Sequence, residues 1–149
     1  MKIEIMPYRR KVHFYETDQM GVVHHSNFIK WFEEARVAFM DQMEFSYERA
    51  TEVGIDFAVL GVRCDYVSMV RFGETVDILL SFSNLTPTRM TVSYRVTDSV
   101  TGELRAKGET LHCYYSGKRL RPISLQRELP ELFELFSMHY LPDKTDSGQ

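Results

Sequence analysis

The segment from Thr17 to Arg36 carries the side chains with the clearest potential for chemistry. An acid, Asp18, is followed by Gly21 and by two adjacent histidines, His24 and His25, just ahead of an expected helix. The first N–H groups of a helix have no partner within it, and the helix dipole adds positive potential there. Such a helix start stabilises a developing negative charge. A carboxylate facing it predicts acyl transfer, with Asp18 as the reactive group.

Asp18 also has a structural interpretation, in which its carboxylate caps the backbone of its own turn. Its position in a link between strand and helix favours function, because loops on a rigid scaffold aim side chains into clefts. Gly21 lets the loop turn tightly or lets a ligand approach the backbone. We therefore count Gly21 as a candidate substrate-binding residue, and the residues alone leave both interpretations of Asp18 open.

The paired histidines are unlike a metal site. Neighbouring side chains in extended or loop backbone point to different sides, and the chain has no H-x-x-x-H or H-E-x-x-H spacing. We expect no metal, and one of the two histidines could instead pair with Asp18 as a base. Cys64 and Cys113 lack a C-x-x-C pattern and are expected to be buried thiols in a reducing compartment.

Two further sets of charged residues have open roles. Glu33 and Arg36 are three residues apart on the expected helix, a spacing that favours a structural ion pair. A catalytic role for Glu33 is the alternative. Near the other end, "GKRLRPISLQR" contains Lys118 and Arg119 among four bases and no acid. This segment is either a solvated loop or a phosphate-binding surface that Arg89 could join.

Composition and charge narrow the function classes. The 149 residues are 44% hydrophobic with a formal charge of −3, which is typical of one globular domain. We predict a single domain over residues 1–141 and a flexible tail over 142–149. The interspersed charges argue against a nucleic-acid partner. Neither an export signal nor a membrane span is expected, so the chain is predicted to be cytoplasmic. The motifs of nucleotide hydrolysis, hydride transfer and serine esterases are absent from the sequence.

The spacing of apolar residues along the chain predicts the helices and strands that must position these side chains. Apolar residues at a helical spacing, after Ser26 or Asn27 as N-cap, predict a long helix from about Asn27 to Met43. Shorter helical segments are expected over 46–54 and 129–136. Apolar residues in alternate positions predict strands over 60–66, 76–82, 90–96 and 104–115, with a first strand over 9–16. In the strand over 104–115, the alternation slips from Leu104 and Ala106 to Leu111 and Cys113, which predicts a β-bulge at Gly108.

This order of elements predicts an α+β fold. The turn-rich links between the last four strands are short enough to make neighbours antiparallel. A sheet with one apolar face must cover that face, and one long helix is all the chain offers for this purpose. We expect a five-stranded antiparallel sheet that curls round the helix. The segment over 129–136 is too small to cover the rest, so dimerisation is also expected.

The stretch "YETDQMGVVHHSNFIKWFEEAR" resembles the signature of the 4-hydroxybenzoyl-CoA thioesterase family of hotdog folds, and most resembles its Tol-Pal-associated branch. The segments "DYVSMVRFGETVDI" and "KRLRPI" are further matches, so the resemblance covers about residues 10–129. It implies a hotdog fold, with a five-stranded antiparallel sheet wrapped around one long central helix. It also implies homodimers or homotetramers, and no cofactor.

The resemblance assigns roles by position. Asp18 matches the catalytic carboxylate, acting as nucleophile or as general base for water. The backbone N–H of His25 matches the group that polarises the thioester carbonyl, and its side chain matches a histidine of the Tol-Pal branch. The implied activity is hydrolysis of a small or medium acyl-CoA, aliphatic or aromatic. Arg89, Lys118 and Arg119 are candidate ligands of the nucleotide part.

Departures from the signature fall at four positions. Glu16 stands in place of Asp, His24 in place of an aromatic residue, Phe28 in place of Tyr and Val70 in place of Pro. His24 and Phe28 are candidate residues of the acyl pocket, which His24 could reshape. A related branch carries its catalytic Glu on the central helix, at the position of Glu33. Because Asp18 is present, we interpret Glu33 as the structural partner of Arg36.

Three other functions are alternatives for this fold. An acyl-acyl-carrier-protein thioesterase would perform the same chemistry with a protein partner. A non-catalytic acyl-CoA-binding hotdog protein would keep the fold without turnover. A hydratase would need a histidine paired with a carboxylate across a dimer, and its motifs are not visible. The sequence leaves the acyl group and the oligomer size open.

Overall fold

The computed structural model describes residues 4–142. The expected tail over 142–149 lies outside these residues except for its first position, and the division into one domain and a tail stays a prediction. No helix within the described residues is long and apolar enough to cross a membrane.

One long helix, α1 (Ser26–Gln42), forms the centre of the molecule. Its bounds differ by one residue at each end from the predicted helix. Its buried face includes Phe28, Trp31, Phe32 and Phe39, each with at most 3% of its surface exposed. Burying each such side chain contributes about 1.5–3 kcal/mol. The predicted apolar stripe is therefore the face that α1 packs against the sheet.

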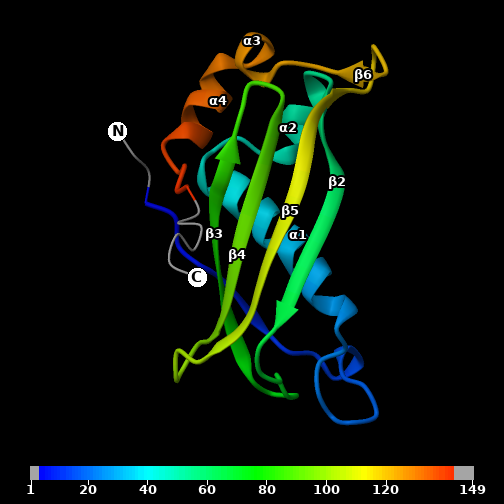
Figure 1. Ribbon diagram of the computed structural model, residues 1–149, viewed down its shortest axis with the longest axis vertical. Helices are drawn as coiled ribbons and strands as arrows, with labels where there is room; N and C mark the ends of the chain where they lie inside the picture. The colour runs from blue at the N-terminus through cyan, green and yellow to red at the C-terminus, as the bar shows by residue number, and fades with distance from the viewer. Residues whose placement is uncertain (1–3, 143–149) are drawn as a thin grey trace, which may run out of the picture.

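The sheet is antiparallel throughout and curves around α1 (Figure 1). Its path runs β1-β3-β4-β5-β2, and a short β6 pairs with the end of β5. The strands are β1 (Tyr8–Lys11), β2 (Ile55–Tyr66), β3 (Thr75–Leu85), β4 (Arg89–Asp98), β5 (Leu104–Ser116) and β6 (Arg121–Pro122). Five of these strands overlap the predicted ones, although β2 begins at Ile55 and not at residue 60. The predicted α+β sheet around one helix is confirmed.

Short helices complete the fold. They are the 3-10 turn η1 (Phe14–Glu16), α2 (Tyr47–Glu52), α3 (Leu125–Glu128) and α4 (Pro130–Ser137). The first strand was predicted over 9–16, but β1 ends at Lys11 and η1 replaces its second half. The reason is Glu16, whose carboxylate turns back to accept a hydrogen bond from the His13 N–H at 2.8 Å.

The predicted β-bulge at Gly108 is wrong. Gly108 pairs in register with Cys64 on β2 and with Tyr94 on β4. From Ala106 to Ser116 the inner face of β5 alternates without a slip, and its buried members include Thr110 and His112. Because Thr110 and His112 are polar, the apolar pattern in the sequence did not show that their side chains lie on the buried face. The pairing register shifts instead at three other places: between residues 59 and 61 of β2, between residues 82 and 84 of β3, and at Arg105 of β5, which lies between the residues that pair with Thr97 and Val96.

Gly108 is required because Phe32 packs against its backbone. A Cβ at Gly108 would lie 2.4 Å from two ring atoms of Phe32 and 3.0 Å from the Arg63 carbonyl oxygen. We predict that Gly108→Ala lowers the free energy of unfolding by about 1–3 kcal/mol, because the ring must leave its position. Gly61→Ala is the matched control, since nothing lies within 4 Å of a Cβ there. Urea unfolding measures both, and equal effects of the two substitutions would contradict the proposed clash.

Candidate active site

Asp18 lies in a small hairpin loop that leads into α1. Thr17 bridges Val23 in antiparallel fashion, and the Asp18 N–H donates to the Val22 carbonyl at 2.9 Å. Asp18 Oδ1 accepts a hydrogen bond from the Met20 N–H at 2.8 Å, which is the turn-capping contact anticipated for this residue. Within residues 4–142, the second carboxylate oxygen has no hydrogen-bond partner. Asp18 therefore caps its turn with one oxygen and presents the other to solvent.

Gly21 makes the tight turn of this loop possible. Its φ is +75°, a left-handed conformation that glycine adopts without steric cost. A Cβ at Gly21 would meet nothing within 4 Å. Its position is thus explained by the turn itself, and the open space beside it also leaves the backbone approachable.

A buried ion pair fixes the loop to the helix. The Glu16 carboxylate accepts hydrogen bonds from Arg10 Nη2 at 2.9 Å and from Trp31 Nε1 at 2.8 Å. The Glu16 side chain is only 3% exposed and that of Arg10 11%. The Glu16 carbonyl also accepts from the His24 N–H at 2.8 Å and from the Asn27 side chain at 2.8 Å. Glu16 thus ties β1, the hairpin loop and the start of α1 together.

Sequence reasoning missed this anchoring role of Glu16. Its only signal was a departure from the family signature, together with the single tryptophan of the chain at Trp31.

The two histidines directly precede α1 and contact its first residues. The His24 ring accepts the Ser26 N–H at Nδ1, at 3.2 Å, and the same nitrogen lies 2.8 Å from the Ser26 hydroxyl. The rings of His24 and His25 stack with centroids 4.1 Å apart. His24 therefore acts as a side-chain cap of the helix. Within the described part of the chain, no group of three or more His, Cys, Asp or Glu residues is placed to hold a metal ion.

The His25 backbone presents an unpaired donor beside the loop. Its carbonyl accepts the Tyr66 hydroxyl at 2.8 Å, but the His25 N–H has no acceptor among residues 4–142. Phe28, one turn further on, is buried and packs edge-on against Tyr66 with centroids 5.2 Å apart. The helix start, the end of β2 and the Asp18 loop thus form one continuous corner of the molecule.

The segment after β2 holds this corner in place. The Val70 carbonyl accepts the Val23 N–H of the hairpin loop at 2.8 Å. Arg105, which is 8% exposed, donates to the Met69 carbonyl at 3.0 Å and to Glu74 at 2.8 Å. This buried cation and its partners fix the 66–72 segment against β5.

The candidate phosphate-binding residues lie at the opposite end of the sheet. Tyr66, beside His25, pairs with Ala106, whereas Ser116 pairs with Ile55 at the other end of β2. These pairings are ten residues apart, or roughly 33 Å along a strand. Arg89 pairs with Cys113 near the end of β5, and Lys118 and Arg119 lie in the link between β5 and β6, at this far end of the sheet (Figure 1). One protomer therefore does not bring them to Asp18.

The same basic residues have structural contacts of their own. Arg119 forms an ion pair with Glu128, and the Lys118 stem lies over Gly54. Arg89 begins β4 and is exposed.

The predicted ion pair between Glu33 and Arg36 is wrong. Glu33 is exposed, and Arg36 Nη1 donates to the Tyr94 hydroxyl at 2.9 Å. Arg36 turns toward the sheet because its inner face offers polar partners, a feature that only the packing of α1 reveals. Cys113 is a buried free thiol, as predicted, while Cys64 is only partly buried.

Arg36, which is partly buried on α1, contacts a cluster of buried polar side chains on the inner face of the sheet, formed by Tyr94, Thr110 and His112. The Tyr94 and Thr110 hydroxyl oxygens lie 2.7 Å apart, and Thr110 Oγ1 lies 2.7 Å from His112 Nε2. Burial, and secondly the Arg36 charge, lower the pKa of His112 to about 4. Burial raises the pKa of Tyr94 to about 12. His112 is therefore neutral, and Tyr94 protonated, at neutral pH.

Neutral His112 predicts a pH dependence of stability. Between the ordinary pKa of 6.5 and the folded value of about 4, the unfolded chain binds a proton that the folded chain does not. The free energy of unfolding should fall with falling pH in this window, by up to about 1.4 kcal/mol per unit from this group. Urea unfolding of wild type and His112→Gln between pH 7 and pH 4 measures it. The two curves should converge as pH falls, and parallel curves would contradict the prediction.

Comparison with known proteins gives consistent matches along most of the chain. The model of the thioesterase-like superfamily matches residues 12–133. A protein of Aquifex aeolicus that carries a provisional esterase name is 32% identical over 127 residues, which are 85% of this chain and 96% of that protein. The acyl-CoA thioester hydrolase YbgC of Escherichia coli is 20% identical over 124 residues, 83% of this chain and 92% of that protein.

Among solved structures, the DHNA-CoA thioesterase of Staphylococcus aureus has a TM-score of 0.83 and 27% identity. The match covers 89% of this chain and 88% of that one.

Proposed function

The chain belongs to the thioesterase-like superfamily and is a thioester hydrolase of the hotdog fold, and we propose that it hydrolyses a small or medium acyl-CoA at the Asp18 loop. The observation that carries this proposal is a free carboxylate oxygen of Asp18 and a free N–H of His25 at one anchored corner. A base or nucleophile and a carbonyl-polarising donor are the two groups that acyl transfer needs.

The chemistry has two forms that share these residues. As a nucleophile, the Asp18 carboxylate attacks the thioester carbon, the C–S bond breaks with release of the coenzyme A thiolate, and water then hydrolyses the mixed anhydride. As a general base, Asp18 takes a proton from water, whose oxygen attacks the same carbon. In both forms the His25 N–H stabilises the oxyanion. Thiolate is a good leaving group, so no strong acid is required.

The proposed branch of the family and the proposed substrate are supported by the names of similar proteins and by the positions of residues in this chain. The His25 side chain matches the Tol-Pal-associated branch, and E. coli YbgC is named an acyl-CoA thioester hydrolase. The S. aureus structure is named for an aromatic acyl group. His24 and Phe28, at the helix start, are the proposed walls of the acyl pocket. We propose a cytoplasmic location, where free thiols such as Cys64 and Cys113 persist.

A panel of acyl-CoAs tests the activity. Release of free thiol should be detected for one or more of acetyl-, butyryl-, octanoyl- and benzoyl-CoA, with matched acyl-carrier-protein thioesters assayed in parallel. Faster turnover of the carrier-protein thioesters would favour the alternative substrate class. Tight acyl-CoA binding without turnover of any member would contradict the hydrolase activity and favour a binding protein.

We also propose that the working enzyme is a homodimer joined through β2. This strand lies at one end of the sheet path and exposes Val59, Leu60 and Val62 by 51%, 51% and 42%. Long apolar edge strands pair with another chain unless they are protected. A twofold axis beside β2 would place the partner's β2 antiparallel to β2 of this protomer. It would carry the partner's Lys118 and Arg119 toward the Asp18 loop, where they could contact the nucleotide.

The dimer is tested by a charge on the β2 edge. Val62→Asp should convert the dimer to a monomer and reduce thiol release, because both the interface and the nucleotide contacts are lost. Val100→Asp is the control, since Val100 is 90% exposed in the turn between β4 and β5. Light scattering coupled to size exclusion measures the mass. A monomeric wild-type protein with full activity would refute this proposal.

A further inference from the structure

The start of α1 offers one free N–H group at the proposed site. The Ser26 N–H donates to His24 Nδ1 at 3.2 Å, and the Asn27 N–H donates to the His24 carbonyl at 3.0 Å. The Phe28 N–H donates to the His25 carbonyl at 3.4 Å, whereas the His25 N–H has no acceptor among residues 4–142. Of these four N–H groups, that of His25 is therefore the one available to a developing oxyanion.

A single donor stabilises an oxyanion only when it has the right direction. N–H···O bonds favour angles above about 150° and weaken steeply below about 120°. The His25 N–H shares a rigid peptide plane with the His24 carbonyl, so the N–H turns only when this plane turns. The orientation of the plane relative to α1 depends on φ and ψ of His25, which are −55° and −31°. A contact that holds these two angles therefore also holds the donor.

Tyr66, the last residue of β2, makes such a contact from the sheet. Its hydroxyl donates to the His25 carbonyl at 2.8 Å, across 41 residues of sequence. Its ring lies edge-on to the His25 ring, with centroids 6.3 Å apart, and edge-on to the Phe28 ring at 5.2 Å. Burial, and secondly Cys64, raise the pKa of Tyr66 to about 12. The hydroxyl therefore keeps its proton at neutral pH and acts as a donor.

The Tyr66 hydroxyl is carried on a fixed frame but lies near solvent. Tyr66 pairs with the fully buried Ala106 of β5 and packs against Phe28, which is 3% exposed. Tyr66 itself is 48% exposed. Water can replace its hydroxyl at the His25 carbonyl, so loss of this hydrogen bond should change the stability of the fold little. What water does not replace is a donor held at a fixed position by the sheet.

We infer that Tyr66 is a positioning residue for the His25 N–H, because its hydroxyl holds the His25 carbonyl and with it the geometry of the residue that presents the donor. This role rests on the proposed function, whereas the contact between hydroxyl and carbonyl does not. Tyr66 transfers no proton and forms no bond to the acyl group. Asp18 still attacks the thioester carbon or activates water, and Tyr66 affects only how well the oxyanion is bound.

Tyr66→Phe tests this inference, since it keeps the ring and removes the hydroxyl. It should lower kcat about tenfold for the acyl-CoA that wild type hydrolyses fastest, and leave KM within about twofold. Complete removal of an oxyanion donor costs about 10²–10³-fold, and a misdirected donor should cost less. The loss falls on kcat because the contact matters only in the transition state. Light scattering should give the same mass as for wild type.

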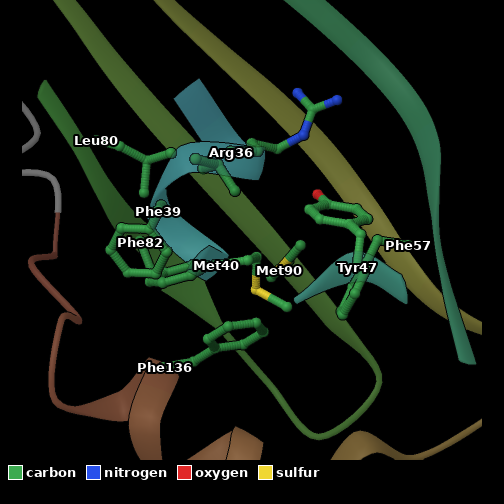
Figure 2. Close-up of a pocket in the computed structure, with 10 residues that line it drawn as sticks. Arg36, Phe39, Met40, Tyr47, Phe57, Leu80, Phe82, Met90 and Phe136 are labelled. Carbon is green, nitrogen blue, oxygen red and sulfur yellow. The ribbon is translucent and has the colours of Figure 1, made fainter. Parts of the chain in front are cut away.

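Two tyrosines supply matched controls. Tyr140 is 46% exposed, and its hydroxyl makes no hydrogen bond within the described residues, so Tyr140→Phe should leave kcat and stability unchanged. Tyr47 lines a cavity between α1 and the β3–β4 hairpin, where its hydroxyl points toward Arg36 (Figure 2). Arg36 lies roughly 16 Å along α1 from His25. Tyr47→Phe should therefore lower the free energy of unfolding and leave kcat unchanged.

NMR spectroscopy of the free protein tests the contact without any substrate. The carbonyl carbon resonance of His25 should shift in Tyr66→Phe and stay in place in Tyr140→Phe. An unchanged His25 resonance, an unchanged kcat, or conversion of Tyr66→Phe to a monomer would each overturn the inference. So would a tenfold loss of kcat in Tyr47→Phe, because a general loss of stability would then explain the effect.

A measurement on wild type covers the case in which Tyr66→Phe does not fold, as judged by circular dichroism. Nuclear Overhauser contacts should join the Tyr66 ring to the rings of His25 and Phe28, and their absence would overturn the inference. Absence of thiol release by wild type would refute the proposed function, and the His25 resonance would still decide whether Tyr66 holds the helix start.

Discussion

Asp18→Asn is expected to lower kcat/KM for acyl-CoA hydrolysis by about 10²-fold or more. Asparagine keeps the shape and can still accept the Met20 N–H through its side-chain oxygen, so the hairpin loop should remain folded. What it loses is the negative charge that attacks the thioester carbon or takes a proton from water. Thiol release over the acyl-CoA panel measures the effect at substrate concentrations above and below KM.

Two matched variants make this result specific. Asp41→Asn removes a carboxylate from the exposed side of α1 and should leave activity unchanged. Glu33→Gln tests the acid at the helix position that a related branch uses, and it should also retain activity. Full activity of Asp18→Asn, or a 10²-fold loss in Glu33→Gln alone, would move the chemistry away from Asp18.

Glu16→Gln should be the most destabilising of the proposed charge substitutions, at about 3 kcal/mol. It leaves Arg10, whose side chain is 11% exposed, without its buried carboxylate partner, and such a loss typically costs about 3–5 kcal/mol. The lower value is expected because Glu34 still pairs with Arg10 at 2.9 Å. Urea unfolding measures the change.

Activity should fall as well, even where the variant is fully folded. The Glu16 carboxylate also holds Trp31 and the backbone of His13, so the hairpin loop that carries Asp18 loses its anchor. Asp77→Asn is the control, because its partner Arg9 is 67% exposed and surface pairs contribute about 1 kcal/mol or less. Equal destabilisation by the two variants would show that Glu16 does not anchor the loop.

The sequence by itself determined the main elements and where to look for chemistry. The apolar period of α1 placed its ends within one residue, because a helix facing a core repeats its buried residues locally. Alternation placed β2, β3, β4 and β5 for the same reason. The sequence identified Asp18, Gly21 and His25 because all three lie in one short loop before a helix. Their proximity therefore does not depend on contacts with distant parts of the chain. Their roles stay predictions that Asp18→Asn tests.

The tertiary structure decided everything that depends on partners distant in sequence. Thr110 and His112 are buried because α1 brings Arg36 to Tyr94. A search for alternating apolar residues cannot detect buried polar residues that form hydrogen bonds with one another. Gly108 is glycine because Phe32 lies on it, a contact across 76 residues of sequence in the printed chain.

Glu16 likewise anchors the loop through Arg10 and Trp31. The register of β2 on β5 separates Lys118 and Arg119 from Asp18. Local periodicity reports which face of an element is buried. Which side chains come into contact on that face is determined by tertiary packing, because packing depends on the positions of all elements of the chain together.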